Sequence, residues 1–154
     1  MLTCYTILVP IDLSDQSKIA LKQAERIAVL TKGELVLLSC IENFRKKIKF
    51  FDEDDEGYVN DKLELQFRLD LLVSEVASRT GLKVNGMVTK WKTDKTIAEV
   101  ADLVGAKLIV MGTNGGPLGF SKKNGSKAIG VVSKSPCPVI TIKGEEHFNG
   151  CRTI

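Results

Sequence analysis

Five short apolar runs along the chain predict buried strands. Four of them are nearly continuous in apolar residues and the third alternates loosely; all are bounded by glycine, proline or polar residues. Runs of this length and composition are typical of strands covered on both faces of a sheet. The predicted strands are 5–11, 34–41, 82–89, 107–111 and 138–143.

Between the strands, apolar residues recur at the three- and four-residue spacing of helices. Ser14 or Asp15 can cap the first helix, and Gly33 is its stop signal. Gly81 and Gly105 close the next two. The expected helices span 15–30, 63–76, 96–104 and 125–134, and Gly130 is expected to weaken the last by about 1 kcal/mol relative to alanine.

One segment, 43–61, has no clear periodicity. It carries a basic block at 45–49, then Phe50 and Phe51, then an acidic block at 52–56. The pattern favours a solvated mobile loop over a loop that docks a partner.

Alternating strands and helices at this spacing predict right-handed crossovers and a parallel sheet with helices on both faces. In such sheets ligands bind beyond the carboxyl ends of the strands, where the strand order reverses. Asp12 follows the first strand, Cys40 lies near the end of the second, and Gly112 follows the fourth. We therefore expect all three residues at one edge of the sheet.

The composition of the chain narrows the classes of protein it can belong to. At 154 residues, 44% of them hydrophobic and 27% charged, it matches one ordinary globular domain, expected over 1–144, with a polar tail at 145–154. The four cysteines form no CxxC pair, so neither a disulfide framework nor a metal site is expected. A net charge of +3 is too small to indicate nucleic acid. Without a leader or membrane-spanning run, we expect a cytoplasmic protein that binds no membrane.

Cations and glycines are concentrated near the end of the chain. The window 103–144 contains six lysines, no Asp or Glu, and eight of the 13 glycines. Glycines let backbone N–H groups approach an anion, and a helix that follows them adds its dipole. This region is therefore the candidate site for a phosphate group.

Four motifs, in order, make the chain resemble the universal stress protein family over nearly its whole length. They are ILVPIDLS at 7–14, LIVMG at 108–112, the loop pattern G-x2-G-x9-G-[S/T] starting at Gly112, and SPCPV at 135–139. The resemblance implies an α/β, Rossmann-like three-layer sandwich of the adenine nucleotide α-hydrolase-like type, with a five-stranded, mostly parallel sheet. In the subgroup that keeps this loop it also implies binding of ATP or AMP, with or without Mg²⁺.

The resemblance assigns residues to the adenosine end of such a ligand. By position, Asp12 would reach the adenine or ribose, and Cys40 would contact adenine through its backbone. The charge of Asp12 supports this placement, because an ionised carboxylate beside a triphosphate would be repelled. At the sugar or base it can accept hydrogen bonds from a hydroxyl or amino group.

The same resemblance assigns the phosphate end. Gly112 and Gly115 would line the ribose and phosphates, whereas Gly125 and Ser126 would hold phosphate oxygens. Ser126 is expected at a helix start, where its N–H, its hydroxyl and the helix dipole can face an anion. Lys127 stands where the family has a small apolar residue, and it either neutralises a phosphate or points to solvent.

The residues predict binding more strongly than catalysis. The chain has no Walker-type lysine followed by Ser or Thr, no carboxylate pair beside the glycines to hold Mg²⁺, and no general base next to Ser126. We therefore expect no catalytic residues and no efficient enzyme. Slow ATP hydrolysis is left as an alternative, because a bound triphosphate needs only a water molecule and a cation to be hydrolysed.

Three functional hypotheses follow. The first is a stress-response module that binds an adenine nucleotide, responds by ordering residues 116–124, and signals to an unidentified protein partner. The second is a nucleotide-independent dimeric interaction module, and the third is a weak ATPase. In each, the last strand is expected to be a sheet edge open to pairing, and the resemblance implies a homodimer there.

Overall fold

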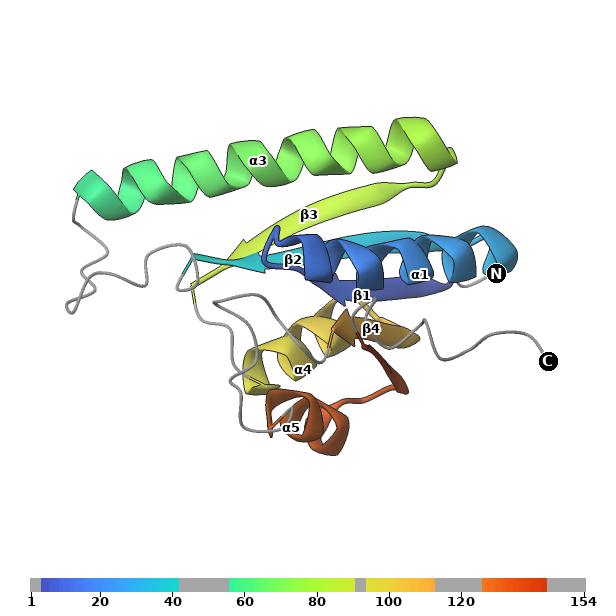
Figure 1. The fold of residues 1–154 in the computed structure, drawn as a ribbon. Helices are drawn as coiled ribbons and strands as arrows, with labels where there is room; N and C mark the ends of the chain where they lie inside the picture. The colour runs from blue at the N-terminus through green and yellow to red at the C-terminus, as the bar shows by residue number, and fades with distance from the viewer. Residues whose placement is uncertain (1–3, 42–55, 91–93, 113–125, 144–154) are drawn as a thin grey trace.

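The computed structural model describes residues 4–41, 56–90, 94–112 and 126–143 (Figure 1). Strands and helices alternate through these residues, as predicted. The elements are β1 (Thr6–Pro10), α1 (Asp15–Thr31), β2 (Glu34–Cys40), α3 (Glu56–Thr80), β3 (Val84–Thr89), α4 (Asp94–Leu103), β4 (Leu108–Gly112), α5 (Ser126–Lys134) and β5 (Val139–Ile142).

The five strands form one sheet in the order β3-β2-β1-β4-β5. All four pairings are parallel, so the predicted mostly parallel sheet is parallel throughout. In the register, Ile7 pairs with Leu35 of β2 on one side and with Leu108 of β4 on the other. β5 lies at an edge of this sheet, as expected for the last strand.

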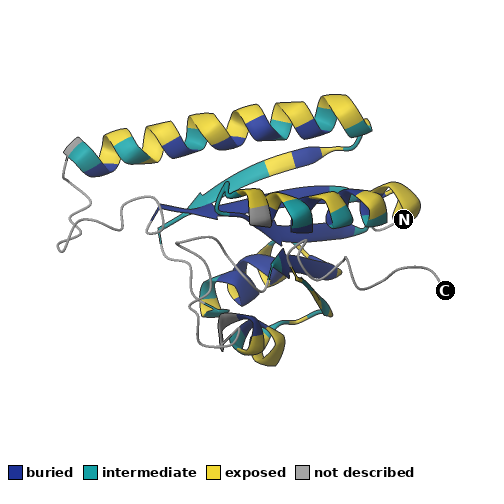
Figure 2. Cartoon of the chain, in the orientation of Figure 1, coloured by how far each residue is buried: buried dark blue, intermediate teal, exposed yellow. Residues whose placement is uncertain are grey.

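The sheet forms the middle of three layers, with α1 and α3 on one face and α4 and α5 on the other (Figure 1). Alternate residues of each strand point to opposite faces. Accordingly, Ile7 and Val9 of β1 pack with the α1–α3 side, and Leu8 packs with the α4–α5 side. β1 is buried throughout because both of its faces are covered (Figure 2). The predicted α/β three-layer sandwich is confirmed.

The first helix ends differently from the prediction. Ser14 caps its start, as one of the two candidates, by accepting the Ser17 N–H at 3.2 Å. At its other end, however, Lys32 and not Gly33 adopts the left-handed conformation, with φ 51°. Gly33 is needed for a different reason: a β-carbon there would lie 2.2 Å from the carbonyl oxygen of Tyr5.

The helix α3 begins earlier than predicted. Residues 56–61, assigned to a loop from sequence, are its first turns, and Tyr58 within them is buried. Tyr58 packs in a small cluster with Ile41 and Leu65, at the end of the sheet where β2 stops. This tertiary burial stabilises turns whose polar sequence gives no helical period. The remaining part of the predicted loop, 43–55, lies outside the described residues.

Gly130 also has a role that its helix propensity does not reveal. A β-carbon at this position would approach the Asp94 carboxylate to 2.2 Å. That carboxylate accepts a hydrogen bond from Lys134 Nζ at 2.7 Å, which joins α4 to α5. Alanine would favour the isolated helix by about 1 kcal/mol but would displace this ion pair, so helix propensity alone does not determine the effect of this glycine on the folded protein.

A polar pair at the start of the sheet makes stability depend on pH. Thr6 and Glu34 are paired in register, and the Thr6 hydroxyl donates to Glu34 Oε1 at 2.7 Å. This hydrogen bond, supported by Lys83, lowers the pKa of Glu34 below 4.5 in spite of its partial burial. A carboxyl whose pKa is lowered by folding contributes stability above its unfolded pKa and loses it as the pH falls through the folded pKa.

The substitution Glu34→Gln should therefore lower the free energy of unfolding by about 1 kcal/mol at neutral pH. The deficit should be constant above about pH 6 and shrink below 4.5, where the wild-type carboxyl takes up its proton. Urea unfolding of both proteins between pH 7 and about pH 3.5 measures it. A deficit that grows on acidification would show that the ionised form is not the one stabilised.

Candidate functional site

The strand order reverses between β1 and β4, the two central neighbours of the sheet. From β1 the chain passes into α1 on one face, whereas α5, which follows β4 in the chain, packs on the other face (Figure 1). Helices that leave adjacent strands in opposite directions open a crevice at the carboxyl ends of those strands. The structure places Asp12 and Gly112 at this crevice, beyond β1 and at the last position of β4.

Asp12 is held in a tight turn between β1 and α1. Its Oδ1 accepts the backbone N–H of Ser14 at 2.9 Å, and Ser14 in turn caps the helix. Of the two residues that the sequence offers for the cap, Ser14 takes it, and Asp12 is engaged in the same turn. The turn fixes the orientation of a half-buried carboxylate at the crevice.

Leu13, between these two residues, is a functional signal that sequence reasoning missed. It has φ 66°, a left-handed conformation that costs a non-glycine residue about 1–2 kcal/mol. Its side chain packs against the buried cluster of Ile41, Tyr58 and Leu65, which compensates for the strained backbone. Strained residues of this kind gather at ligand sites. Leucine carries no sequence signal for a left-handed turn, so only the structure reveals it.

Cys40 ends β2, which pairs with β1 on the side away from β4. It is buried, and its thiol donates to the carbonyl oxygen of Lys90 at 3.1 Å. The thiol is therefore directed toward β3, since Cys40 pairs in register with Thr89 of that strand. This leaves the predicted contact with adenine to the Cys40 backbone.

The glycine loop joins β4 to α5, and its two ends are placed. Gly112 ends β4, and α5 begins at Ser126, with Lys127 in its first turn. The first N–H groups of a helix have no partner inside the helix, and the first turn of α5 holds no acidic residue. Gly115 and Gly125 lie outside the described residues, as does the expected ordering of 116–124; the side chains of Ser126 and Lys127 are likewise not described.

The lysines that cluster in the sequence separate in the fold. Lys107 precedes β4 and so lies at the amino edge of the sheet, opposite the crevice. Lys134 ends α5, where it is paired with Asp94. Lys143 follows β5 at the carboxyl edge and is exposed. The lysines that the structure describes therefore do not gather at one place, and Lys127 is the lysine closest in sequence to the first N–H groups of α5.

The described residues contain neither a candidate metal cluster nor a candidate membrane-spanning helix. No group of three or more His, Cys, Asp or Glu side chains lies close enough to hold a metal ion among them. Within the same ranges, no helix combines the length and the apolar character needed to cross a membrane.

Comparisons with known proteins agree with this architecture. A model of the universal stress protein family matches residues 5–143. The universal stress protein Sll1654 of Synechocystis sp. is 30% identical over 139 residues, which make up 89% of this chain and 84% of the relative. UspA from Lactobacillus plantarum has the same fold, with a TM-score of 0.72 at 24% identity, over 90% of this chain and 97% of its own.

Two solved structures with this fold contain an adenine nucleotide. A universal stress protein from Archaeoglobus fulgidus, in complex with dAMP, gives a TM-score of 0.64 at 21% identity over 93% of this chain and 100% of its own. A second universal stress protein structure, in complex with cAMP, gives a TM-score of 0.65 at 20% identity, over 92% of this chain and 98% of its own. The family match extends from the residue before β1 to the residue after β5, and the chain belongs to the universal stress protein family.

Proposed function

We propose that this protein binds an adenine nucleotide in the crevice between β1 and β4. The observation that carries the proposal is the meeting of Asp12 and Gly112 at the point where the strand order reverses, with α5 starting at Ser126 beyond them. A carboxylate acceptor, a glycine backbone and a helix start match the three parts of a nucleotide: base or sugar, sugar–phosphate and phosphate.

The ligand would lie along the carboxyl edge of the sheet. Asp12 accepts hydrogen bonds from the ribose or adenine, and the backbone at Cys40 borders adenine. Gly112 and Gly115 line the ribose and phosphates. Gly125, Ser126 and Lys127 hold the phosphate oxygens through the first turn of α5. The dAMP and cAMP complexes of two relatives support an adenine nucleotide as the ligand class.

Asp12→Asn should weaken binding of ATP and AMP by about tenfold or more, because it removes one charge-assisted acceptor. The asparagine side-chain oxygen can still accept the Ser14 N–H, so the turn and the helix cap should persist. Asp15→Asn, an exposed carboxylate three residues away, is the matched control and should bind as the wild type does. Fluorescence or calorimetric titration of the three proteins measures it; equal affinities would remove Asp12 from the site.

Gly112→Ala should leave the fold intact and reduce nucleotide affinity by at least about tenfold. Among the described residues, an alanine β-carbon would have only an ordinary contact, 3.9 Å from the Ile142 carbonyl oxygen, so the unfolding midpoint should not move. The same methyl group would occupy the space through which a ribose or phosphate approaches the backbone. Thermal unfolding and titration separate the two effects. Unchanged affinity would place the nucleotide elsewhere.

We further propose that the chain forms a homodimer through β5 and that nucleotide binding regulates what this surface presents to a partner. Ile140 of β5 and Ile129 and Val132 of α5 are exposed. The same helix starts at the nucleotide site, so α5 connects the ligand to this surface. Sedimentation with and without saturating ATP tests the link: an ATP-dependent change in association supports it, and no change would refute the regulatory role while leaving nucleotide binding intact.

A further inference from the structure

The helix α3 has two apolar faces, and the described part of the fold buries one of them. Its inner face is buried against the sheet and α1, through Tyr58, Leu65, Leu69, Leu72 and Val76. A second set of large apolar residues is exposed by between 46% and 64%: Val59, Leu63, Phe67 and Leu71. Their four-residue spacing places them in one ridge along the helix, here called the outer stripe.

The outer stripe points away from the molecule. At about 100° per residue its centre lies roughly 170° around the helix from the centre of the buried face. Figure 2 shows the exposed colour on this side of α3 along most of its length. The stripe extends over about 18 Å of helix and exposes apolar area on the order of 400 Å², the size at which patches on a monomer tend to be functional.

The charges beside the stripe are arranged for a second copy of the same helix. On one edge, Glu64 and Arg68 are about half exposed. On the other edge lie Lys62, Gln66 and Asp70, of which Lys62 and Asp70 are exposed. An antiparallel pairing centred on Gln66 sets residue 64 of one copy against residue 68 of the other, and residue 62 against residue 70. Both combinations join opposite charges, and the two-fold axis repeats each of them.

We propose that the outer stripe is an interface at which two copies of this chain associate, with their α3 helices antiparallel about Gln66. Antiparallel packing of four-residue ridges covers both stripes and opposes the two helix dipoles favourably. With its charged rim, the stripe approaches the roughly 800 Å² that each partner contributes to a standard interface. α3 packs on β3, at the opposite end of the sheet from β5, so this interface is separate from the proposed β5 dimer (Figure 1).

A charge exchange tests the pairing directly. Glu64→Lys and Arg68→Glu should each weaken self-association by at least about tenfold, because each places like charges opposite one another. Mixing the two variants should restore the larger assembly, since lysine at 64 then meets glutamate at 68 of the other copy. Restoration cannot come from the Glu64–Arg68 pair within the helix, because each variant chain keeps its own like-charge pair in the mixture.

The control variant is Glu99→Lys, which makes the same change in an exposed pair on α4 and should leave the mass of the assembly unchanged. Sedimentation velocity over a range of concentrations measures all of these proteins. If the separate variants associate as the wild type does, or if their mixture stays at the mass of the variants alone, the proposed pairing is wrong.

A second variant tests the apolar stripe. Phe67→Glu should weaken the same association step by about thirtyfold or more, as expected for an aromatic residue at the centre of an interface. Leu103→Glu, at an exposed leucine on α4, is the matched control and should have no effect. Because both positions are exposed, the unfolding midpoints should remain close to that of the wild type. Loss of association in both variants, or in neither, would overturn the proposal.

Discussion

Replacing Gly33 by alanine is expected to lower the free energy of unfolding by about 3 kcal/mol. The new β-carbon would lie 2.2 Å from the Tyr5 carbonyl oxygen, which is far inside van der Waals contact. That oxygen accepts the Glu34 N–H at 3.0 Å where β2 begins. No flexible side-chain end can move aside, so the backbone that joins β2 to β1 must shift and weaken this hydrogen bond.

The neighbouring residue supplies the control. Lys32 carries the left-handed conformation, so Lys32→Gly should raise the free energy of unfolding by about 1 kcal/mol. Urea unfolding of both variants measures the two effects. If Gly33 were only the stop signal of the helix, Gly33→Ala would have a small effect. A loss below about 1 kcal/mol for Gly33→Ala would contradict the close approach to Tyr5.

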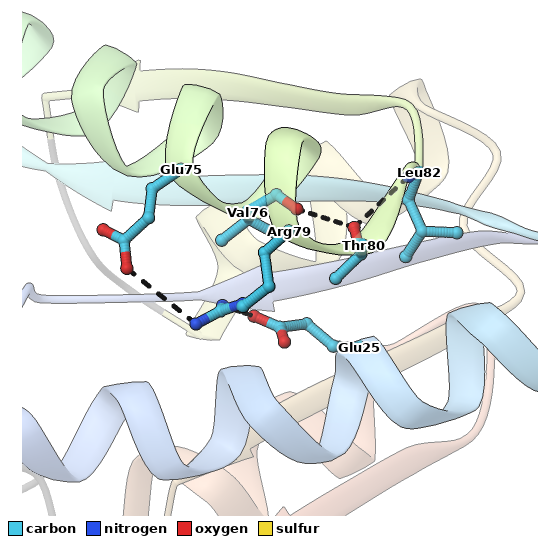
Figure 3. Close-up of polar contacts among 6 residues, drawn as sticks. All are labelled: Glu25, Glu75, Val76, Arg79, Thr80 and Leu82. Carbon is cyan, nitrogen blue, oxygen red and sulfur yellow. Dashed lines mark hydrogen bonds and ion pairs between the residues drawn. The ribbon is translucent and has the colours of Figure 1, made fainter.

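Arg79→Ala is expected to lower the free energy of unfolding by about 2–3 kcal/mol, because a nearly buried carboxylate then lacks its partner cation. Arg79 of α3 donates to Glu25 Oε1 of α1 at 2.6 Å, and the Glu25 side chain is only 11% exposed (Figure 3). In Arg79→Ala that carboxylate loses its cation in a largely water-free position. Because Arg79 itself is about half exposed, the cost should fall below that of a fully buried pair.

A second arginine on the same helix provides the comparison. Arg68 pairs with Glu64, four residues away, but both side chains are about half exposed. At protein concentrations too low for self-association, Arg68→Ala should therefore change the free energy of unfolding by no more than about 0.5 kcal/mol. In the double variant Glu25→Gln/Arg79→Ala, much of the cost of Arg79→Ala should disappear because no buried charge remains. Two outcomes would contradict a stabilising role for the Arg79–Glu25 ion pair. One is an equal loss of unfolding free energy in the two arginine variants, and the other is a loss in the double variant that equals the sum of the two single losses.

Most of the fold could be predicted because its strands carry a strong local pattern. β1 and β4 are buried on both faces by helices, so their apolar residues run without interruption. The alternation with helices then fixes the parallel arrangement, and the parallel arrangement brings Asp12 and Gly112 to one edge. The location of the candidate site thus follows from the order of elements along the chain.

The start of α3 could not be predicted, because residues 56–61 are mostly polar and show no helical period. Its first turns depend on the burial of Tyr58, a contact between residues distant in sequence. Helix propensities of a few tenths of a kcal/mol per residue are too weak to decide against such contacts.

Two further features could not be predicted from the sequence: the left-handed conformations of Leu13 and Lys32, and the separation of the lysines in the fold. Sequence rules assign left-handed conformations to glycine, whereas here Leu13 and Lys32 adopt them at a cost of about 1–2 kcal/mol. Side-chain packing compensates at Leu13, and the Lys32 N–H donates to the last carbonyl groups of α1. Nearness in sequence also does not bring the lysines together in the fold. Lys107 lies at the opposite end of the sheet from the crevice, since β4 separates it from the glycine loop, and Lys134 is paired with Asp94 at the start of α4.

Calorimetric titration of the purified protein with ATP, ADP and AMP, with and without Mg²⁺, tests nucleotide binding at the crevice most directly. One site per chain with a dissociation constant on the order of micromolar is predicted for ATP or AMP, weakened at least about tenfold by Gly112→Ala. A folded protein that gives no binding heat with any of the three at millimolar concentration, across several temperatures, would contradict the proposal.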